Sequence, residues 1–274
     1  MHLHIAHETI YRYDAPLERS TQYLRLTPRP GMGLQVRGWQ LRLPAPASRT
    51  RDAYGNVLHV LTLDGPRHEI RLFAEGEVDT LDGESRPDAS DDALPPPVFL
   101  RDSPLTRADD ALRDFAAAHA VAVQADPVEG LQGLMAALGA RMPYTPGATD
   151  VATAASEAFA SGHGVCQDHA QVFVALARLL GLPARYVSGY LAADAAHVAS
   201  HAWAEVRLTR GTEEGWLGFD VSNQCLANGR HVRLAVGLDY LDACPVRGMR
   251  LGGGSEALHT QVAVQPGAAQ AQQQ

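Results

Sequence analysis

The sequence predicts an α+β protein, in which an N-terminal antiparallel β-sandwich-like domain precedes a domain of helices and then strands. Three observations support this fold class. Apolar and polar residues alternate in short stretches over the first 80 residues, apolar residues fall three and four apart after about residue 100, and strand-like runs return after residue 183. Alternation is typical of half-buried strands, whereas the wider spacing is typical of amphipathic helices. Strands and helices that occupy separate stretches favour α+β over an alternating parallel fold.

Residues 1–80 are expected to form the β-rich N-terminal domain. Turn signals rich in glycine, proline and asparagine occur at 29–31, 54–56 and 64–66, and they separate the alternating stretches at short intervals. The strands expected between these turns are His4–Tyr13, Tyr23–Leu26, Val36–Leu43, Val57–Leu63 and Glu69–Val78.

Residues 81–103 are acidic and proline-rich without periodicity, so they are interpreted as a linker that ends the first domain. Residues 104–265 form the expected core domain. The low-complexity end of the chain, 266–274, is predicted to be disordered.

The core domain begins with helical spacing and ends with strands. Helices are expected over Pro104–Ala120, Val128–Arg141, Thr153–Ala160 and Cys166–Leu180, the last of which stops at the run Gly181-Leu182-Pro183. The expected strands are Ala184–Leu191, His201–Leu208, Gly215–Asp220, His231–Val236 and Leu258–Val264.

The composition excludes several classes of protein. A net charge of −8 and a pI of 5.8 argue against nucleic-acid binding, which normally needs a basic face. There is no basic segment followed by an apolar one at the N-terminus, and no run approaches about 18 apolar residues, so a cytoplasmic protein without membrane contact is expected. The sequence does not indicate an oligomeric state.

The cysteines are too few for a disulfide framework. The chain contains three of them, Cys166, Cys225 and Cys244, which suits a reducing compartment. All 23 basic residues are arginine, and we attribute the lack of lysine to a biased composition.

Cys166 is the strongest candidate for a catalytic residue, because it lies where the loop Gly162-His163-Gly164-Val165 enters the best predicted helix. Free N–H groups and the positive end of the helix dipole favour an anion at this position, which favours the reactive thiolate. The Cys166 N–H could also donate to a developing oxyanion. A buried structural cysteine is the alternative interpretation.

His201 and Asp220 are the candidate partners of Cys166. Alternation along the strand puts His201, Trp203 and Glu205 on one face, and Asp220 closes the next strand. An aspartate beside the imidazole would hold one tautomer and stabilise the imidazolium. Taken singly, His201 is one of twelve histidines and Asp220 could be a turn residue.

These residues lie in runs that resemble a known family. The stretch GVCQDHAQVFVALARLLGLPARYVSGYL, followed by SHAWAEV and GWLGFDVSNQ, resembles the core of the bacterial transglutaminase-like superfamily, with its papain-like order of Cys, His and Asp. HETIYRYDAP and LRLTPRP are similar to the β-rich domain that precedes this core in bacterial proteins. The resemblance implies a papain-like α+β core with Cys166 as nucleophile, His201 as general base and acid, and Asp220 as its orienting partner.

Two features depart from the family pattern. Relatives often read Asp-Pro-Thr-Asn after the catalytic aspartate, whereas this chain reads Asp220-Val221-Ser222-Asn223. No stretch has the carboxylate spacing of a calcium loop, so neither a metal nor another cofactor is expected.

The expected chemistry is acyl transfer from a carboxamide or peptide bond through a thioester on Cys166. Water as acceptor would make the protein a cysteine protease or amidase, and an amine would make it a protein-glutamine acyltransferase; the triad residues cannot separate the two. A protein or peptide is the expected substrate. The non-enzymatic alternative is a binding or assembly module that keeps the fold. Tyr144 is a candidate oxyanion donor, although a buried aromatic is the more ordinary interpretation.

Other side chains receive weaker interpretations. His163, Cys166 and His169 have spacing that could suit a metal, but a zinc site would leave the glycine-flanked cysteine unexplained. His163 and His169 are instead expected to line the cleft or contact solvent. Strand tryptophans usually fill cores, and Trp203 and Trp216 are assigned there. Arg185 is a weak candidate for binding a carboxylate.

Overall fold

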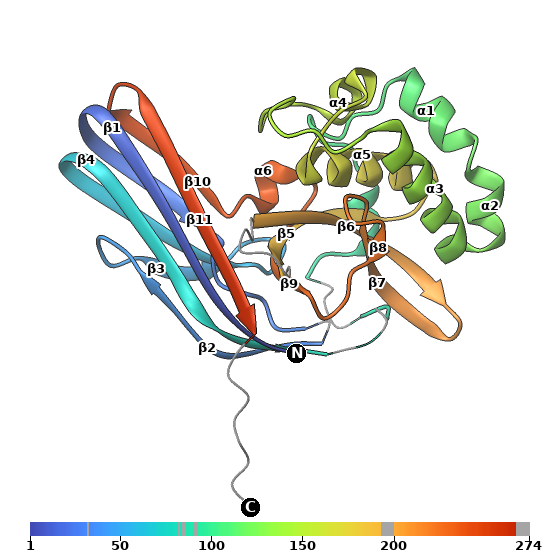
Figure 1. The fold of residues 1–274 in the computed structure, drawn as a ribbon, viewed down its shortest axis with the longest axis horizontal. Coiled ribbons are helices and arrows are strands. Elements are labelled where there is room, and N and C mark those ends of the chain that lie inside the picture. The colour runs from blue at the N-terminus through green and yellow to red at the C-terminus, as the bar shows by residue number, and fades with distance from the viewer. Residues whose placement is uncertain (32, 82, 84–85, 90–92, 193–199, 267–274) are drawn as a thin grey trace, which may run out of the picture.

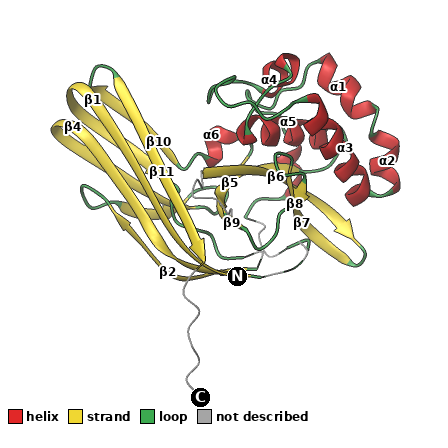
Figure 2. Ribbon diagram, viewed as in Figure 1, coloured by secondary structure: helices red, strands yellow, loops and turns green. Residues whose placement is uncertain are grey.

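The computed structural model describes residues 1–31, 33–81, 83, 86–89, 93–192 and 200–266. Two antiparallel sheets make up the two halves of the molecule, and the larger helices gather on the second (Figures 1 and 2). The predicted α+β class is therefore confirmed. Within the described part of the chain, no helix has both the length and the apolar composition needed to cross a bilayer.

Among the described residues, the first sheet has six strands with the long β1 and β4 at its centre. β2 and β3 pair with opposite ends of β4, and β11 and β10 pair with opposite ends of β1. The strands are β1 (His2–Leu24), β2 (Leu34–Arg42), β3 (Ser48–Arg51), β4 (Val57–Thr80), β10 (Val246–Gly252) and β11 (Glu256–Pro266).

β1 and β4 are each one long strand where the sequence predicted two. The predicted turn at 64–66 is wrong, because these residues lie inside β4. The pairing of β1 with β4 shifts register between Arg12 and Leu17 and again before Arg19. Such bulges bend a strand without ending it, which explains why a turn signal can stand inside one.

The second sheet has the order β8-β7-β6-β5-β9 in the described residues, and all its neighbours are antiparallel. The four long strands predicted for this part of the chain are confirmed within a few residues. The strands are β5 (Ala184–Leu191), β6 (Ser200–Arg210), β7 (Glu213–Asp220), β8 (Cys225–Leu226) and β9 (His231–Gly237).

Six α-helices and a short 3₁₀ helix lie in the described residues. The predicted helix over Pro104–Ala120 starts only at Asp110, because the Asp109 side chain accepts the Leu112 N–H and caps it. The helices are η1 (Pro96–Leu100), α1 (Asp110–Ala117), α2 (Ala120–Ala125), α3 (Pro127–Arg141), α4 (Ala155–Ser161), α5 (Cys166–Leu179) and α6 (Tyr240–Ala243).

Helix α5 is the centre of the second half. Every residue from Asp168 to Arg178 is buried, since the second sheet packs on one side of the helix and α1, α3 and α4 on others. Phe173 stacks on Phe219 of β7 with ring centroids 5.3 Å apart. This packing fixes the start of α5, and therefore Cys166, against the sheet.

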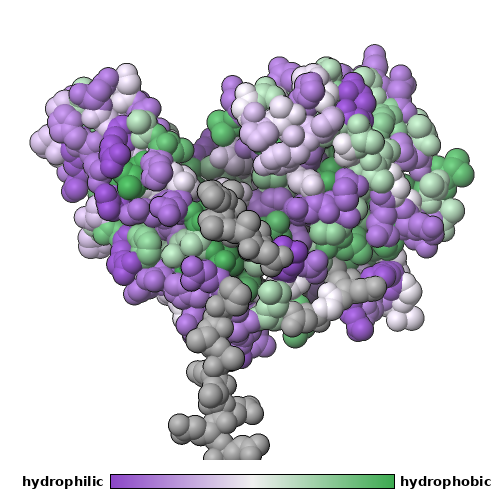
Figure 3. All heavy atoms as spheres, viewed as in Figure 1, coloured by the Kyte–Doolittle hydropathy of each residue, from purple (hydrophilic) through white to green (hydrophobic). Residues whose placement is uncertain are grey.

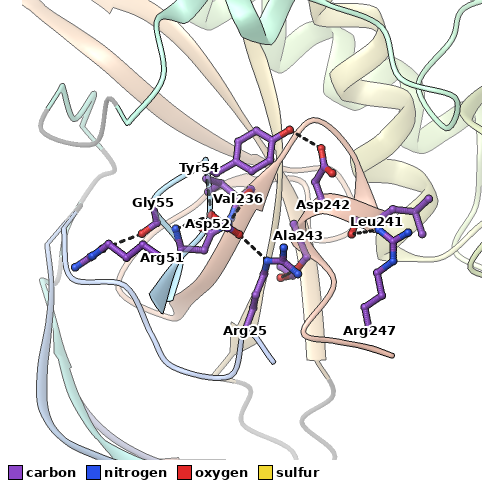
Figure 4. Close-up of polar contacts among 12 residues, drawn as sticks. Arg25, Arg51, Asp52, Tyr54, Gly55, Val236, Leu241, Asp242, Ala243 and Arg247 are labelled. Carbon is purple, nitrogen blue, oxygen red and sulfur yellow. Dashed lines mark hydrogen bonds and ion pairs between the residues drawn. The ribbon is translucent and has the colours of Figure 1, made fainter. Parts of the chain in front are cut away.

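Buried polar contacts join the two halves of the molecule. The Asn56 side chain donates to the Val236 carbonyl (2.8 Å) and accepts the Val236 N–H (2.9 Å). The Tyr54 hydroxyl donates to Asp242 in α6 (2.5 Å), and within the first half Asp52 accepts from Arg25 at 2.7 Å (Figure 4). The halves also share an apolar cluster drawn from β1, β4, β5, β9 and β11. They are thus packed as one unit.

The predicted domain limits differ from the structure in two places. The core range 104–265 included β10 and β11, but both strands pair with β1 and complete the first sheet. The linker range 81–103 holds η1, whose Phe99 packs on Trp216 of β7 with ring centroids 4.9 Å apart. The predicted disordered tail lies outside the described residues from 267 onward.

Candidate active site

The loop before α5 is built so that Cys166 can begin the helix. Asp168 is fully buried and accepts the Val165 N–H (2.8 Å) and the Thr149 hydroxyl (2.6 Å), which closes the first turn. Gly164 leaves room for this cap, because a Cβ there would lie 2.7 Å from the Asp168 Cβ. Cys166 is half-buried at the first helical position, where its N–H has no partner within the helix.

His201 and Asp220 meet at one end of the second sheet. His201 is the second residue of β6, and Asp220 is the last residue of β7. The imidazole Nε2 lies 2.7 Å from the Asp220 Oδ2, with the histidine side chain 10% exposed and the aspartate fully buried. The predicted pairing of these two side chains is thus present in the structure.

The partners of His201 change its protonation. Burial works against the imidazolium, but the hydrogen bonds and charges of Asp220 and Cys166 outweigh it and raise the pKa of His201 to about 9. Burial likewise opposes ionisation of Asp220, yet the hydrogen bonds from His201 and His231 hold the pKa of this carboxyl well below its usual range. His201 therefore stays protonated near neutral pH beside an ionised aspartate and the Cys166 thiol.

His231 of β9 is a partner of Asp220 that the sequence analysis missed. Its Nε2 lies 3.0 Å from the same Asp220 Oδ2, and the ring is buried. The Asn228 N–H donates to the Nδ1 at 3.1 Å, so the proton of a neutral His231 is on Nε2 and points at Asp220. A lone histidine at a strand start carries no local signal of such a role.

Asn223 holds the other side of Asp220. Its backbone N–H donates to Oδ1 at 3.1 Å, and its side-chain amide donates to Oδ2 at 2.7 Å. The turn after Asp220 therefore fixes the carboxylate without the proline that relatives often carry. The departure from the family pattern leaves the carboxylate well held.

His169 is a structural side chain, contrary to the prediction that it lines the cleft or contacts solvent. Its Nε2 donates to the Met142 carbonyl (2.8 Å), its Nδ1 accepts from the Ser222 hydroxyl (2.9 Å), and the residue is 2% exposed. Burial lowers the pKa of His169 despite the opposing effects of the Met142 carbonyl and nearby carboxylates. The neutral ring joins α5 to the turn that holds Asp220. His163, in contrast, is exposed as predicted.

Tyr144 lies near the nucleophile and is not the buried aromatic of the ordinary interpretation. It is 54% exposed, its backbone forms a bridge with Gly164, and its ring centroid is 6.1 Å from that of His169. Burial of part of the ring and the nearby Cys166 and Asp168 raise the pKa of the Tyr144 phenol. The hydroxyl therefore remains a hydrogen-bond donor near Cys166, and its role as an oxyanion donor stays a prediction.

Within the described chain, one group of side chains has the closeness that a metal site needs. The ligand atoms of His201, Asp220 and His231 lie within 4.8 Å of one another, whereas His163, Cys166 and His169 form no such group. The Asn228 N–H occupies the His231 Nδ1, so Nε2 carries a proton where a metal would need its lone pair. The group therefore fits a hydrogen-bonded cluster better than a metal centre.

The remaining candidates are structural. Trp203 and Trp216 are at most 2% exposed, as expected for core residues. Arg185 is 1% exposed, donates to Glu205 at 2.7 Å and stacks over Trp216 at 4.0 Å. The suggestion that Arg185 binds a substrate carboxylate is therefore wrong, because a carboxylate of the protein already occupies the guanidinium.

The surroundings of Cys166 lie between the two halves of the molecule. Cys166 packs against the same buried cluster as Tyr240 of α6, the short helix between the first sheet and α5 (Figure 1). The molecular surface is hollowed between these halves (Figure 3).

The fold and these side chains define a class of protein: a cysteine begins a buried helix, and the helix packs on an antiparallel sheet that carries His201 and Asp220. Residues 115–221 match the transglutaminase-like superfamily, and residues 3–79 match the bacterial transglutaminase-like N-terminal region. The chain belongs to the transglutaminase-like superfamily, as the sequence resemblance predicted.

Known proteins are similar to this chain over most of its length. An uncharacterized protein of Mycobacterium bovis is 32% identical over 89% of this chain and 86% of its own length. Another uncharacterized protein, from Mycobacterium leprae, is 27% identical over 96% of this chain and 98% of its own. The crystal structure of a suspected cysteine protease from Cytophaga hutchinsonii has a TM-score of 0.73 at 21% identity, and the match covers 96% of this chain and 90% of that one. The structural likeness shows the shared fold.

Proposed function

We propose that this protein is a thiol-dependent enzyme that acts on a carboxamide or peptide bond through a thioester on Cys166. The observation that supports this most directly is the arrangement around His201, which lies 2.7 Å from a fully buried Asp220 on one side and next to Cys166 on the other. A histidine between a thiol and a carboxylate can move a proton in both directions while its ring stays oriented.

The proposed first step forms the thioester. The Cys166 thiolate attacks the carbonyl carbon, and the Cys166 N–H stabilises the oxyanion, with the Tyr144 hydroxyl as the second donor we propose. The carbon–nitrogen bond then breaks, and the leaving amine or ammonia takes the proton held by His201. Asp220 orients the ring and stabilises its charged form throughout.

The second step releases the acyl group. Water or an amine attacks the thioester as His201 takes its proton, the carbon–sulfur bond breaks, and a free acid or a new amide leaves the thiol restored. Water makes the protein a cysteine protease or amidase, and an amine makes it an acyltransferase. Because the chain contains no lysine, an ε-amino acceptor would have to come from another molecule.

The test combines a peptide carrying a glutamine amide with an isotope-labelled primary amine, followed by mass spectrometry. Thioester chemistry predicts free acid, labelled amide or both from the wild type, and neither from Cys166→Ala. Label in the product assigns transfer, and free acid alone assigns hydrolysis.

A thiol-labelling experiment separates an enzyme from a binding module that only keeps the fold. Iodoacetamide should label Cys166 near pH 7 well before the other two cysteines, because burial raises the pKa of the Cys225 and Cys244 thiols. Equal rates at all three cysteines, together with no product from the wild type, would favour the binding module.

A further inference from the structure

We infer that His231 is a positioning residue that holds Asp220 and shares its negative charge, and thereby limits how tightly His201 binds its proton. The inference rests on the proposed function. His231 is 8% exposed, and its Nε2 lies 3.0 Å from the oxygen that His201 contacts at 2.7 Å. His231 thus joins Cys166, His201 and Asp220 as the fourth side chain of the inferred arrangement.

The direction of each hydrogen bond follows from the contacts of the ring. Because the Asn228 N–H donates to Nδ1 at 3.1 Å, that nitrogen is the acceptor and Nε2 is the donor. The His231 ring packs edge-on against Trp203 (5.2 Å between centroids), and Trp203 stacks on His201 (6.1 Å). His231 is therefore fixed by packing as well as by its hydrogen bonds.

The expected effect of His231 follows from the shared oxygen. Asp220 Oδ2 accepts from His201, His231 and Asn223, so three donors divide the charge of one carboxylate oxygen. Without the His231 N–H, more of that charge acts on His201 and its imidazolium becomes harder to deprotonate. A histidine that holds its proton too tightly is a weaker acid for the leaving group. The other titratable groups that interact with His201 or Asp220 are Cys166, His169 and Cys225.

Two matched variants test the inference. In His231→Gln, the amide nitrogen takes the place of Nε2 and keeps the donor to Asp220. In His231→Asn, the shorter amide reaches only the place of Nδ1, so the contact with the Asn228 N–H stays and the donor to Asp220 is lost. NMR titration of the His201 ring should give a midpoint near 9 in the wild type. It should stay there in His231→Gln and rise by about one pH unit in His231→Asn.

Turnover should follow the same pattern. For His231→Asn we expect kcat to fall about tenfold with KM unchanged, and for His231→Gln we expect most of the rate to return. A folded His231→Asn with the wild-type midpoint would overturn the inference. A wild type without any turnover would instead overturn the proposed function, and the NMR titration would still decide the role of His231.

An independent observation concerns a groove on the first sheet, away from Cys166. We call it the basic groove, and it has a volume of about 780 Å³. Its floor includes a half-buried row of apolar side chains at alternate positions, Trp39, Leu41 and Leu43. Arg49 and Arg51 are exposed along its sides, whereas Arg37 pairs with Asp79, and none of the described residues that line the groove is acidic, on a chain whose net charge is −8.

The geometry points to an extended acidic peptide segment of a partner protein as the occupant of the basic groove. β3 carries Arg49 and Arg51 and, among the described residues, pairs only with β4, so its other edge is open to an added strand. Alternate residues of a strand point to one face about 7 Å apart, which matches acidic residues at alternate positions of a peptide. His59, which pairs with Arg49 across β3 and β4, also lines the groove.

A labelled octapeptide that alternates acidic and apolar residues is the probe for the basic groove. We expect fluorescence anisotropy to show salt-sensitive binding, and the double variant Arg49→Glu, Arg51→Glu should raise its Kd about tenfold or more. Arg101→Glu with Arg107→Glu is the control, since it makes the same charge change at exposed sites outside the groove.

Three results would overturn the assignment of the basic groove to an acidic peptide. They are no binding, equal binding of a peptide with lysine in place of each acid, and an equal loss of affinity in the control variant. Laurate that binds where the peptide does not would assign the groove to a small anionic amphiphile instead.

Discussion

Two histidines near Asp220, His201 and His169, differ in the direction of their pKa shifts. His201, at the end of the second sheet, has a direct carboxylate partner and a pKa raised to about 9. His169, in the first turns of α5, has a carbonyl and a hydroxyl as partners, and its pKa is lowered by burial. Both feel the charge of Asp220, so the direct hydrogen bonds that His201 makes with this carboxylate and with Cys166 make the difference.

The comparison shows that burial alone does not decide what a histidine does. At the sheet end, the partners favour a charged ring that can give and take a proton. At the helix start, neutral partners hold an uncharged ring that fixes α5 to the turn after Asp220. The predictions below change the carboxylate beside His201, change His169 or its hydroxyl partner, or vary the pH.

The largest effect is expected from Asp220→Asn. The amide replaces the charged carboxylate that is bonded directly to His201, so the pKa of His201 should fall toward or below its ordinary value. We expect turnover to fall by about 10⁴-fold, as in other triads that lose this carboxylate. Steady-state kinetics and NMR titration of the ring measure the two effects. A variant with full activity would show that the carboxylate is not part of the chemistry.

His169→Leu should damage stability and leave the His201 pKa unchanged. The substitution leaves the buried Met142 carbonyl and the Ser222 hydroxyl without their hydrogen-bond partner. We therefore expect the free energy of unfolding to drop by about 2–4 kcal/mol. Urea unfolding measures this loss. His163→Leu, which changes an exposed histidine of the adjoining loop, is the matched control and should change little. A shifted His201 titration in the His169 variant would mean that the two regions are coupled more closely than their contacts indicate.

The pH dependence of stability and activity should reflect the raised pKa of His201 and the lowered pKa of Asp220. The folded pKa of His201, about 9, lies above the ordinary value of 6.5, so its imidazolium stabilises the fold fully below pH 6.5. That contribution is lost as the pH rises through 9, and kcat/KM should fall about tenfold for each further pH unit. The lowered pKa of Asp220 acts in the other direction, with stability lost on acidification below about pH 4. A fall in kcat/KM that already begins near pH 6.5 as the pH rises would contradict the assignment of a raised pKa to His201.

The smallest effect is expected from Ser222→Ala. It removes one hydroxyl that donates to His169 while the Met142 contact stays, so the free energy of unfolding should fall by about 1 kcal/mol. Activity per folded molecule should be unchanged. A loss of activity much larger than the loss of stability would show that this turn also sets the position of Asp220.

Much of the candidate site could be predicted from local sequence. A glycine-containing loop before an apolar helix marks the start of α5, and the stop at Gly181 marks its end. Alternation on β6 and the aspartate at the end of β7 were enough to suggest that His201 and Asp220 meet. These features depend on neighbours in the chain, which a sequence displays directly.

The contacts that were missed join residues far apart in the chain. His231 and His169 each look like ordinary histidines until β9 and the turn after β7 bring Asp220 and Ser222 to them. Nothing next to Arg185 in the sequence indicates that its guanidinium donates to Glu205 on the neighbouring strand.

The sequence by itself determined the fold class, the helix that presents Cys166 and the pairing expected between His201 and Asp220, because periodicity and turn residues are local properties. Only the tertiary structure decided that β10 and β11 return to the first sheet, that β1 and β4 bend without breaking, and that a second histidine shares the oxygen of Asp220. Strand partners and buried hydrogen bonds depend on which surfaces meet when the chain folds, and nothing local in the sequence records that choice.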